Sequence, residues 1–423
     1  MEQRRQGPTH RRRSDGDRPA GPPPDAISPW VLLRSATNHP FVFKRMVRAV
    51  DPKAEAGDVV QVYDKFGKLF GRGLYHGNSN ITIRMLTRGE TPVDDAFWRG
   101  VLEQAVTLRR DLRLDDVTDA YRLVHAEGDS LSGLIAERYA DCLVFEVFSA
   151  GMHQRVDMIA GVLKDLLGRP TSLDRPDATF DDWRVIVRAD ERIQRIEQFS
   201  VREAPPEGRS TVTIREHGVR YRVDMAGGHK TGFFCDQRDN RLRLAKMCRD
   251  ANVLDLCCYS GGFGLCAKML GGAKDVTSID LDEAALEIAK KNADLNNQRI
   301  KFAHADAFIY LRQMIDIGRT FDVVVCDPPK FATSREEYDI ALRKYYDLNF
   351  LAMQVVRPGG VLLTCSCSGL VSMGKFVETV EASARRAGKL LQRFELTGAS
   401  PDHPVLSNCP ESEYLKAYWC RVM

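Results

Sequence analysis

In the second half of the chain, apolar residues alternate between two spacings. From residue 209 onward, short continuous apolar runs are each followed by a helical pattern, and the clearest runs are VLDL, VTSID, FDVVVC and GGVLLTCS. This alternation is typical of βαβ units, which build a mostly parallel sheet with helices on both faces. We therefore predict an α/β fold, with a Rossmann-like doubly wound domain over residues 206–423.

The first half shows a different pattern. Residues 28–97 contain short runs rich in β-branched and aromatic residues, including PFVFK, DVVQVYD and NITIRML, separated by Gly, Asn and Asp. This predicts a small β-rich domain. Residues 98–205 begin with a helical pattern and continue with strand-like segments and a second helix, which predicts a central α+β domain. A linker is expected at residues 204–208, which read APPEG.

The composition changes this picture mainly at the N-terminus. The chain of 423 residues is 43% hydrophobic and 28% charged, and it holds no apolar run near the ~18 residues of a membrane span, so we expect a cytoplasmic protein without a membrane partner. Residues 1–25 carry six arginines, four acids and five prolines, and we predict a disordered tail over residues 1–27. The net charge of +3 does not by itself establish a nucleic-acid partner.

Eleven cysteines occur without a C-x-x-C pair, which indicates reduced thiols rather than a disulfide framework. Two of them lie in TCSCSG, residues 364–369, at the end of an apolar run. These thiols are candidates for core packing, metal binding or nucleophilic catalysis. A metal pair would need histidine or further cysteine ligands, and His403 and Cys409 are the only later candidates, so we predict no metal site.

A nucleotide site is expected beyond the carboxyl ends of the strands. The first strand runs into a glycine-rich turn, DLCCYSGGFG, and the second ends at Asp280, the separation at which an acid receives ribose hydroxyls. The third strand is followed by Asp306 and Ala307, placed to face an adenine, although a helix N-cap explains Asp306 equally well. Because G-x-G-x-x-G and GK[ST] are absent, S-adenosylmethionine fits better than a dinucleotide or ATP. The predicted contacts in the first turn are Asp255, Tyr259, Ser260, Gly261, Gly262 and Phe263.

The fourth strand ends in CDPPKF, where two prolines follow Asp327 directly. The prolines stiffen the turn, so that it can hold one acid toward a planar base beside the cofactor. A rigid turn with a capping aspartate is the competing interpretation. The predicted substrate contacts are Pro328, Pro329, Lys330 and Phe331, and Asp327 is expected to contact both cofactor and substrate.

The next strand ends in TCSCSG, so this segment should lie beside Asp327 at the same sheet edge. Carbon 5 of a pyrimidine is a poor nucleophile until a thiolate adds to carbon 6, and an acid near the ring nitrogen assists that addition. We predict Cys367 as this nucleophile and Asp327 as the ring-nitrogen partner. Cys365 lies farther from the open end of the strand and is expected in the core, which is also the competing interpretation for any thiol of this chain.

Five segments together resemble one family: GGHKTGFFCDQRDNR, YSGGFG, DPPKF, SCSG and the ending DHPV…YLKAYWCRVM. From residue 28 to residue 423 the chain is similar to the RlmI-type methyltransferases, which make 5-methylcytosine in 23S rRNA. The resemblance implies an RNA-binding PUA domain at 28–97, a central α+β domain and a Rossmann-like methyltransferase domain. It also implies cytosine 1962 of 23S rRNA as the target, Cys367 as the motif cysteine, and a turn at 232–238 that closes over the cofactor, with contacts from Gln237 and Arg238.

Several points stay open. Pro329 occupies the place where the wider class of RNA cytosine-C5 methyltransferases often has a second cysteine, so the base for the release step is not identified. Methylation of a purine ring nitrogen is one alternative, and a non-catalytic PUA-type assembly factor is another. A homodimer is also left open. Because the target cytosine must be extruded, naked 23S rRNA or a large-subunit assembly intermediate is the expected partner.

Overall fold

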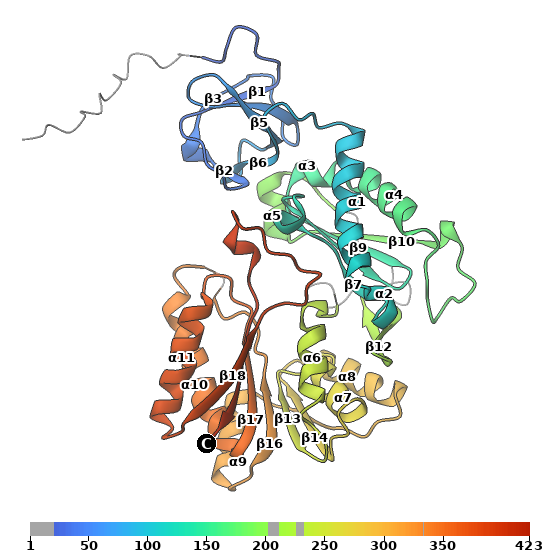
Figure 1. Ribbon diagram of the computed structural model, residues 1–423, viewed down its shortest axis with the longest axis vertical. Coiled ribbons are helices and arrows are strands. Elements are labelled where there is room, and N and C mark those ends of the chain that lie inside the picture. The colour runs from blue at the N-terminus through green and yellow to red at the C-terminus, as the bar shows by residue number, and fades with distance from the viewer. Residues whose placement is uncertain (1–20, 202–210, 226–231, 333) are drawn as a thin grey trace, which may run out of the picture. The chain divides into compact units, whose positions relative to one another are not determined.

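The computed structural model describes residues 21–201, 211–225, 232–332 and 334–423 (Figure 1). The chain forms two compact units, residues 1–97 and 98–423. Most of the predicted tail and all of the predicted linker lie outside the described residues. Among the helices of the described segments, none is long and apolar enough to cross a membrane.

The first unit is a six-stranded sheet in the order β2-β6-β5-β4-β1-β3. Alternate residues of its strands, such as Val31, Leu33, Val60 and Val62, point into one apolar core. The strands β1 and β4 run parallel, and the other neighbours are antiparallel. The elements are β1 (Trp30–Leu33), β2 (Phe41–Phe43), the 3-10 turn η2 (Lys44–Met46), β3 (Val47–Val50), β4 (Val59–Tyr63), β5 (Leu69–Tyr75) and β6 (Ile81–Arg88).

The second unit begins with a four-stranded sheet in the order β10-β9-β8-β7. Two of its helices begin at side-chain caps, because Ser149 accepts the N–H of Met152 and Asp190 accepts the N–H groups of Arg192 and Ile193. The strands are β7 (Ala120–His125), β8 (Leu134–Tyr139), β9 (Cys142–Val147) and β10 (Arg184–Arg188). The helical elements are α1 (Asp95–Asp111), α2 (Leu114–Val117), η3 (Ala126–Asp129), α3 (Ala150–His153), α4 (Val156–Leu167), η4 (Phe180–Asp182) and α5 (Glu191–Glu197).

A hairpin of β11 (Thr211–Glu216) and β12 (Val219–Asp224) precedes the largest sheet. That sheet has seven strands in the order β15-β14-β13-β16-β17-β19-β18, of which the first five are parallel and β19 is antiparallel to both neighbours. The predicted doubly wound α/β domain is therefore confirmed. Its strands are β13 (Asn252–Leu256), β14 (Asp275–Asp280), β15 (Lys301–His304), β16 (Phe321–Cys326), β17 (Val356–Ser366), β18 (Leu391–Thr397) and β19 (Lys416–Val422).

Helices cover both faces of this sheet, as Figure 1 shows. Successive strand residues point to opposite faces, so Val253 packs in a cluster with Leu244 of α6, whereas Leu254 packs with Leu311 of α9. The helical elements are η5 (Cys235–Gln237), α6 (Arg238–Ala245), α7 (Gly262–Met269), α8 (Glu283–Leu295), α9 (Ala307–Asp316), α10 (Tyr338–Val355), α11 (Met373–Arg386) and η6 (Pro410–Ser412). The carboxyl ends of the five parallel strands are left open between these layers.

Candidate functional site

A cavity of about 810 Å³ opens at the carboxyl ends of the parallel strands. Every one of these five strands contributes a residue at or just after its end, from Cys257 after β13 to Cys367 after β17. The predicted site residues that line it are Gln237, Tyr259, Asp280, Asp306, Ala307, Asp327, Pro328, Pro329, Lys330, Phe331 and Cys367. The lining also contains residues that were not predicted individually: Phe234 and Asp236, which lie in the expected turn at 232–238, and Cys257, Leu281, Asp282, Ala305, Phe308, Lys344, Leu348 and Leu415.

Asp280 is held at the end of β14 by two backbone donors. One carboxylate oxygen accepts the N–H of Tyr259 at 2.8 Å, and the other accepts that of Asp282 at 2.9 Å. Each oxygen has a second lone pair, so these bonds orient the carboxylate without using up its capacity for ribose hydroxyls. Tyr259 lies against Phe234, with ring centroids 4.9 Å apart, and both rings line the cavity.

Asp306 caps a helix and also lines the cavity. Its Oδ1 accepts the N–H groups of Phe308 and Ile309 at 2.9 and 3.0 Å, which makes it the N-cap of α9. At the same time Asp306, Ala307 and Phe308 line the cavity. The N-terminus of α9 therefore presents a polar residue beside an apolar surface, which suits a nucleobase.

The glycine-rich turn after β13 is used largely for packing. Gly261 has φ +81° and begins α7, and a Cβ on Gly264 would lie 2.6 Å from Ser278 Oγ. The backbone N–H of Gly264 donates to Asp255 Oδ2 at 2.9 Å. These close approaches explain why glycine is required, and they seat α7 directly on the sheet.

Six of the predicted cofactor residues do not line the cavity. Asp255, Ser260, Phe263 and Arg238 are buried, and none of them lines the cavity. Gly261 and Gly262 also lie outside the lining, so within this turn only Tyr259 of the predicted contacts faces the cavity. Arg238 instead pairs with Asp402, with Nη2 2.9 Å from Oδ1, in a buried ion pair.

Asp255 is a buried acid beneath the cofactor turn. Its side chain is fully buried, and this burial raises its pKa to about 7, opposed by the hydrogen bond from Gly264. The ordinary value is about 3.9, so the folded protein binds this proton more tightly than the unfolded chain does. The contribution of Asp255 to stability therefore falls as the pH rises from about 4 to about 7.

We expect Asp255→Asn to raise the unfolding temperature of the cofactor-free protein at pH 8 and to change it little at pH 4.5. The gain at pH 8 should be of the order of 1–4 kcal/mol, because the variant has no buried charge to form. The measurement is thermal unfolding of both proteins across this pH range. A difference in unfolding temperature between the two proteins that does not grow with pH would contradict the raised pKa of Asp255.

A chain of hydrogen bonds positions Asp327, and the donor in every bond of the chain is fixed because the first group can only donate. The indole N–H of Trp419, which can only donate, donates to Thr397 Oγ1 at 2.8 Å, and Thr397 donates to Asn240 Oδ1 at 2.7 Å. Asn240 Nδ2 then donates to Gln237 Oε1 at 2.6 Å, and Gln237 Nε2 donates to Asp327 Oδ2 at 3.0 Å. The amide of Gln237 is therefore turned so that its N–H faces the carboxylate.

We expect Thr397→Val to lower the methyl-transfer rate about 3- to 30-fold, because it breaks this chain while keeping the side-chain shape. The binding of S-adenosylmethionine should change by less than twofold. The control is Thr379→Val, which removes a hydroxyl that donates to Lys375 O within α11. Rate constants and cofactor affinities of the three proteins check this, and equal losses in both variants would show a general effect of lost stability.

The two thiols of TCSCSG have different surroundings. Cys365 belongs to β17, is fully buried and packs with Val325 and Trp419. Burial raises its pKa well above the ordinary range. Cys367 follows the strand, is partly exposed and lines the cavity, with Sγ 4.0 Å from Pro328 O. The carboxyl ends of β16 and β17 are adjacent, since Cys326 pairs with Thr364.

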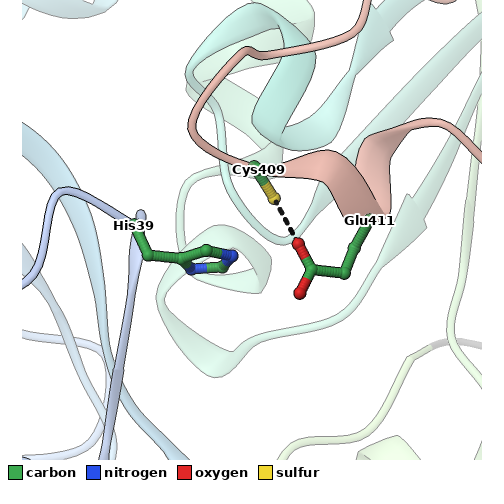
Figure 2. Close-up of side chains that lie close together, drawn as sticks. All are labelled: His39, Cys409 and Glu411. Atoms are coloured by element: carbon green, nitrogen blue, oxygen red, sulfur yellow. Dashed lines mark hydrogen bonds between the residues drawn. The ribbon is translucent and has the colours of Figure 1, made fainter.

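The later candidate metal ligands lie apart from this cavity lining. Cys409 Sγ lies 3.7 Å from a Glu411 carboxylate oxygen, as Figure 2 shows. His403 lies beside Asp402, with Nδ1 3.3 Å from Oδ1. Neither His403 nor Cys409 is among the residues that line the cavity with Cys367.

The strand order, the acids after β14 and β15, and the open cavity define the C-terminal part as an S-adenosylmethionine-dependent methyltransferase domain. The corresponding family model, S-adenosylmethionine-dependent methyltransferase, matches residues 197–413, and a PUA-like domain matches residues 34–88. The ribosomal RNA large subunit methyltransferase I of Aliivibrio fischeri (strain MJ11) is 40% identical over 389 residues, covering 91% of this chain and 96% of the relative. The protein of the same name from Klebsiella pneumoniae (strain 342) is 38% identical over 410 residues, covering 94% and 100%. The chain belongs to the ribosomal RNA large subunit methyltransferase I family.

A solved structure supports the fold independently. A chain described as a methyltransferase complexed with SAH has a TM-score of 0.75 at 20% identity, covering 91% of this chain and 96% of its own. S-adenosylmethionine is the cofactor of this protein, and the cavity suits it. Asp280 offers carboxylate oxygens for hydroxyl groups, and the residues at the start of α9 offer an apolar surface for a base.

Proposed function

We propose that this protein transfers a methyl group from S-adenosylmethionine to carbon 5 of a cytosine in 23S rRNA, through a covalent bond between Cys367 Sγ and carbon 6. The names of the relatives support a large-subunit rRNA substrate. By resemblance to the family, the target is cytosine 1962. The observation that carries the proposal is the placement of Cys367 in the same cavity wall as Asp327 and the acids for the cofactor.

The reaction begins at carbon 6 of the cytosine. The thiolate of Cys367 forms the S–C6 bond, and the C5=C6 electron pair moves to carbon 5 and toward the ring nitrogen. The carboxyl group of Asp327, in its protonated form, donates its proton to this ring nitrogen as the S–C6 bond forms, and Gln237 fixes the orientation of the carboxyl group. The addition of the thiolate to carbon 6 thus converts carbon 5 into an enamine-like nucleophile.

Methyl transfer and release complete the cycle. S-adenosylmethionine supplies an electrophilic methyl group when bound. Carbon 5 takes this methyl group and leaves S-adenosylhomocysteine as the second product. A base then removes the carbon-5 proton, the ring nitrogen returns its proton to Asp327, and the S–C6 bond breaks to restore the aromatic ring and the Cys367 thiolate. In this role Asp280 and Tyr259 orient the cofactor, and Phe331 with the two prolines shapes the base pocket. Pro329 cannot be the base, so another group or water accepts the proton.

A basic surface on the first unit supports RNA binding by the PUA-like domain. Lys44, Arg45 and Arg48 are exposed in consecutive elements η2 and β3, beside Phe43, whose exposed fraction is 37%. Cationic side chains attract the phosphate backbone, and an exposed aromatic ring can stack on an unpaired base. This combination favours a single-stranded or bulged RNA element.

Nucleoside analysis tests the proposal. Protein-free 23S rRNA from cells that lack this activity is incubated with the protein and isotopically methyl-labelled S-adenosylmethionine, then digested to nucleosides and separated. We expect the label only in 5-methylcytidine. Label in a ring-nitrogen-methylated purine, from the same protein, would overturn the cytosine assignment.

A further inference from the structure

Lys416 is a buried cation in the wall behind the cavity. It is the first residue of β19, opposite Ser366 of β17, and its exposed fraction is 2%. Its Nζ donates to Ser368 O at 2.6 Å and to Tyr414 O at 2.7 Å. These two bonds fix the ammonium group beside the segment that contains Cys367.

No carboxylate forms an ion pair with this cation in the described part of the chain. Among the described residues, no Asp or Glu oxygen lies within the 4.0 Å of an ion pair with Lys416 Nζ. A buried ammonium group without a counter-ion is costly, and ionisable groups perturbed by burial and a nearby charge are concentrated at functional sites. The two carbonyl acceptors compensate part of this cost and leave the third ammonium N–H available.

The titratable groups around Lys416 indicate which group can become its counter-ion. Those that act on it are Cys367, Glu413 and Lys330, and of these Glu413 and Lys330 are exposed, and Lys330 carries the same charge as Lys416. Burial lowers the pKa of Lys416 to about 8, and the negative form of Cys367 acts in the opposite direction. Around Cys367, the further groups are Asp327 and Lys330 in the cavity wall, Tyr345 on α10 and Cys365 on β17.

We propose that Lys416 stabilises the thiolate of Cys367 as an ammonium–thiolate pair and so activates the nucleophile of the methyl-transfer site. The role of this pair in catalysis rests on the proposed function. In forming the pair, the S–H bond of Cys367 breaks, its electron pair stays on sulfur, and the proton passes to the Lys416 amine or to solvent. Lys416 acts through Cys367 and is a positioning residue.

The test measures the thiol itself and needs no RNA. The alkylation rate of Cys367 by iodoacetamide is followed from pH 5.5 to 10 in the full-length protein, with peptide mapping by mass spectrometry. We expect a wild-type midpoint below the ordinary thiol value of about 8.5, and a roughly tenfold slower reaction at pH 7 in Lys416→Met. Lys416→Arg should keep the wild-type profile, because it keeps the positive charge.

Cys257 provides an internal control, because it lines the same cavity and its pKa is raised well above the ordinary range, mainly by burial. Its alkylation should be the same in all three proteins, and retained S-adenosylmethionine binding shows that the variants fold. An unchanged Cys367 profile in folded Lys416→Met overturns the proposal. Should that variant not fold, a wild-type midpoint at or above 8.5 overturns it equally.

Failure of the proposed function gives a different result. A protein whose Cys367 responds to Lys416 as expected, but which labels a purine rather than 5-methylcytidine, keeps the ammonium–thiolate pair and loses the cytosine chemistry. A protein that makes 5-methylcytidine with no effect of Lys416 on the thiol keeps the function and loses the pair.

Discussion

Replacing Cys367 with alanine should reduce the methyl-transfer rate by at least about 10³-fold, because no other group would form the bond to carbon 6. The binding of S-adenosylmethionine should stay within about twofold of the wild type, since the nucleophile contacts the base rather than the cofactor in our proposal. Single-turnover kinetics on 23S rRNA and isothermal titration with the cofactor measure the two quantities separately.

Cys365→Ala is the matched control, two residues upstream on the same strand. Cys365 is fully buried in the apolar cluster of β17, so its truncation should lower stability by about 1–2 kcal/mol and leave the rate per folded molecule nearly unchanged. Turnover by Cys367→Ala above a trace, together with a loss in Cys365→Ala, would move the nucleophile to Cys365.

Asp402→Ala should cause the largest loss of stability, about 3–5 kcal/mol, because it removes the buried counter-charge of the Arg238 guanidinium and leaves only the half-exposed Asp239 as its partner. Asp402 is fully buried, and its carboxylate pairs with Arg238 at 2.9 Å and accepts the backbone N–H of Arg122 at 2.9 Å. Its backbone carbonyl accepts from Arg109 Nη2 at 2.6 Å. The residue therefore joins α1 and β7 of the central sheet to the methyltransferase part.

Chemical denaturation of Asp402→Ala and of a surface control checks this. In the control, Asp347→Ala, the lost ion pair with Arg386 is more than half exposed at both side chains, so the change should stay below about 0.5 kcal/mol. His125 lies close to these groups, because its Nδ1 is 2.9 Å from Nη1 of Arg122. Burial and the charge of Arg122 lower the pKa of His125 to about 2, so this imidazole stays neutral. Similar stabilities of the two variants would contradict the role given to Asp402.

The parallel part of the large sheet was predictable because four of its five strands, β13, β14, β16 and β17, consist mostly of buried residues, whereas the edge strand β15 has none. The antiparallel strands β18 and β19 were not predicted. β18 is an edge strand whose residues are all intermediate or exposed, so its sequence LQRFELT carries no continuous apolar run. Lys416, at the start of β19, had entered the predictions only as part of the C-terminal segment YLKAYWCRVM, which carries the resemblance to the family.

The site was predictable to the extent that strand ends converge. Asp280, Asp306, Asp327 and Cys367 were placed correctly at one edge, because parallel strands end together. The spacing of the glycine-rich turn located the turn and not the orientation of its side chains, so Phe263 is a predicted cofactor contact that packs in an apolar cluster outside the cavity lining. The chain from Trp419 to Asp327 joins segments distant in sequence, and no local pattern indicates it.

Covalent trapping tests the central claim most directly. The protein is given S-adenosylmethionine and 23S rRNA fragments in which 5-fluorocytidine replaces cytidine, since fluorine at carbon 5 blocks the release step. Wild-type protein and Cys367→Ala are then compared on denaturing gels. We predict an SDS-stable protein–RNA adduct with the wild type and none with the variant. The absence of an adduct from a wild-type enzyme that still methylates ordinary 23S rRNA would contradict cytosine C5 chemistry and leave both thiols of TCSCSG without a catalytic role.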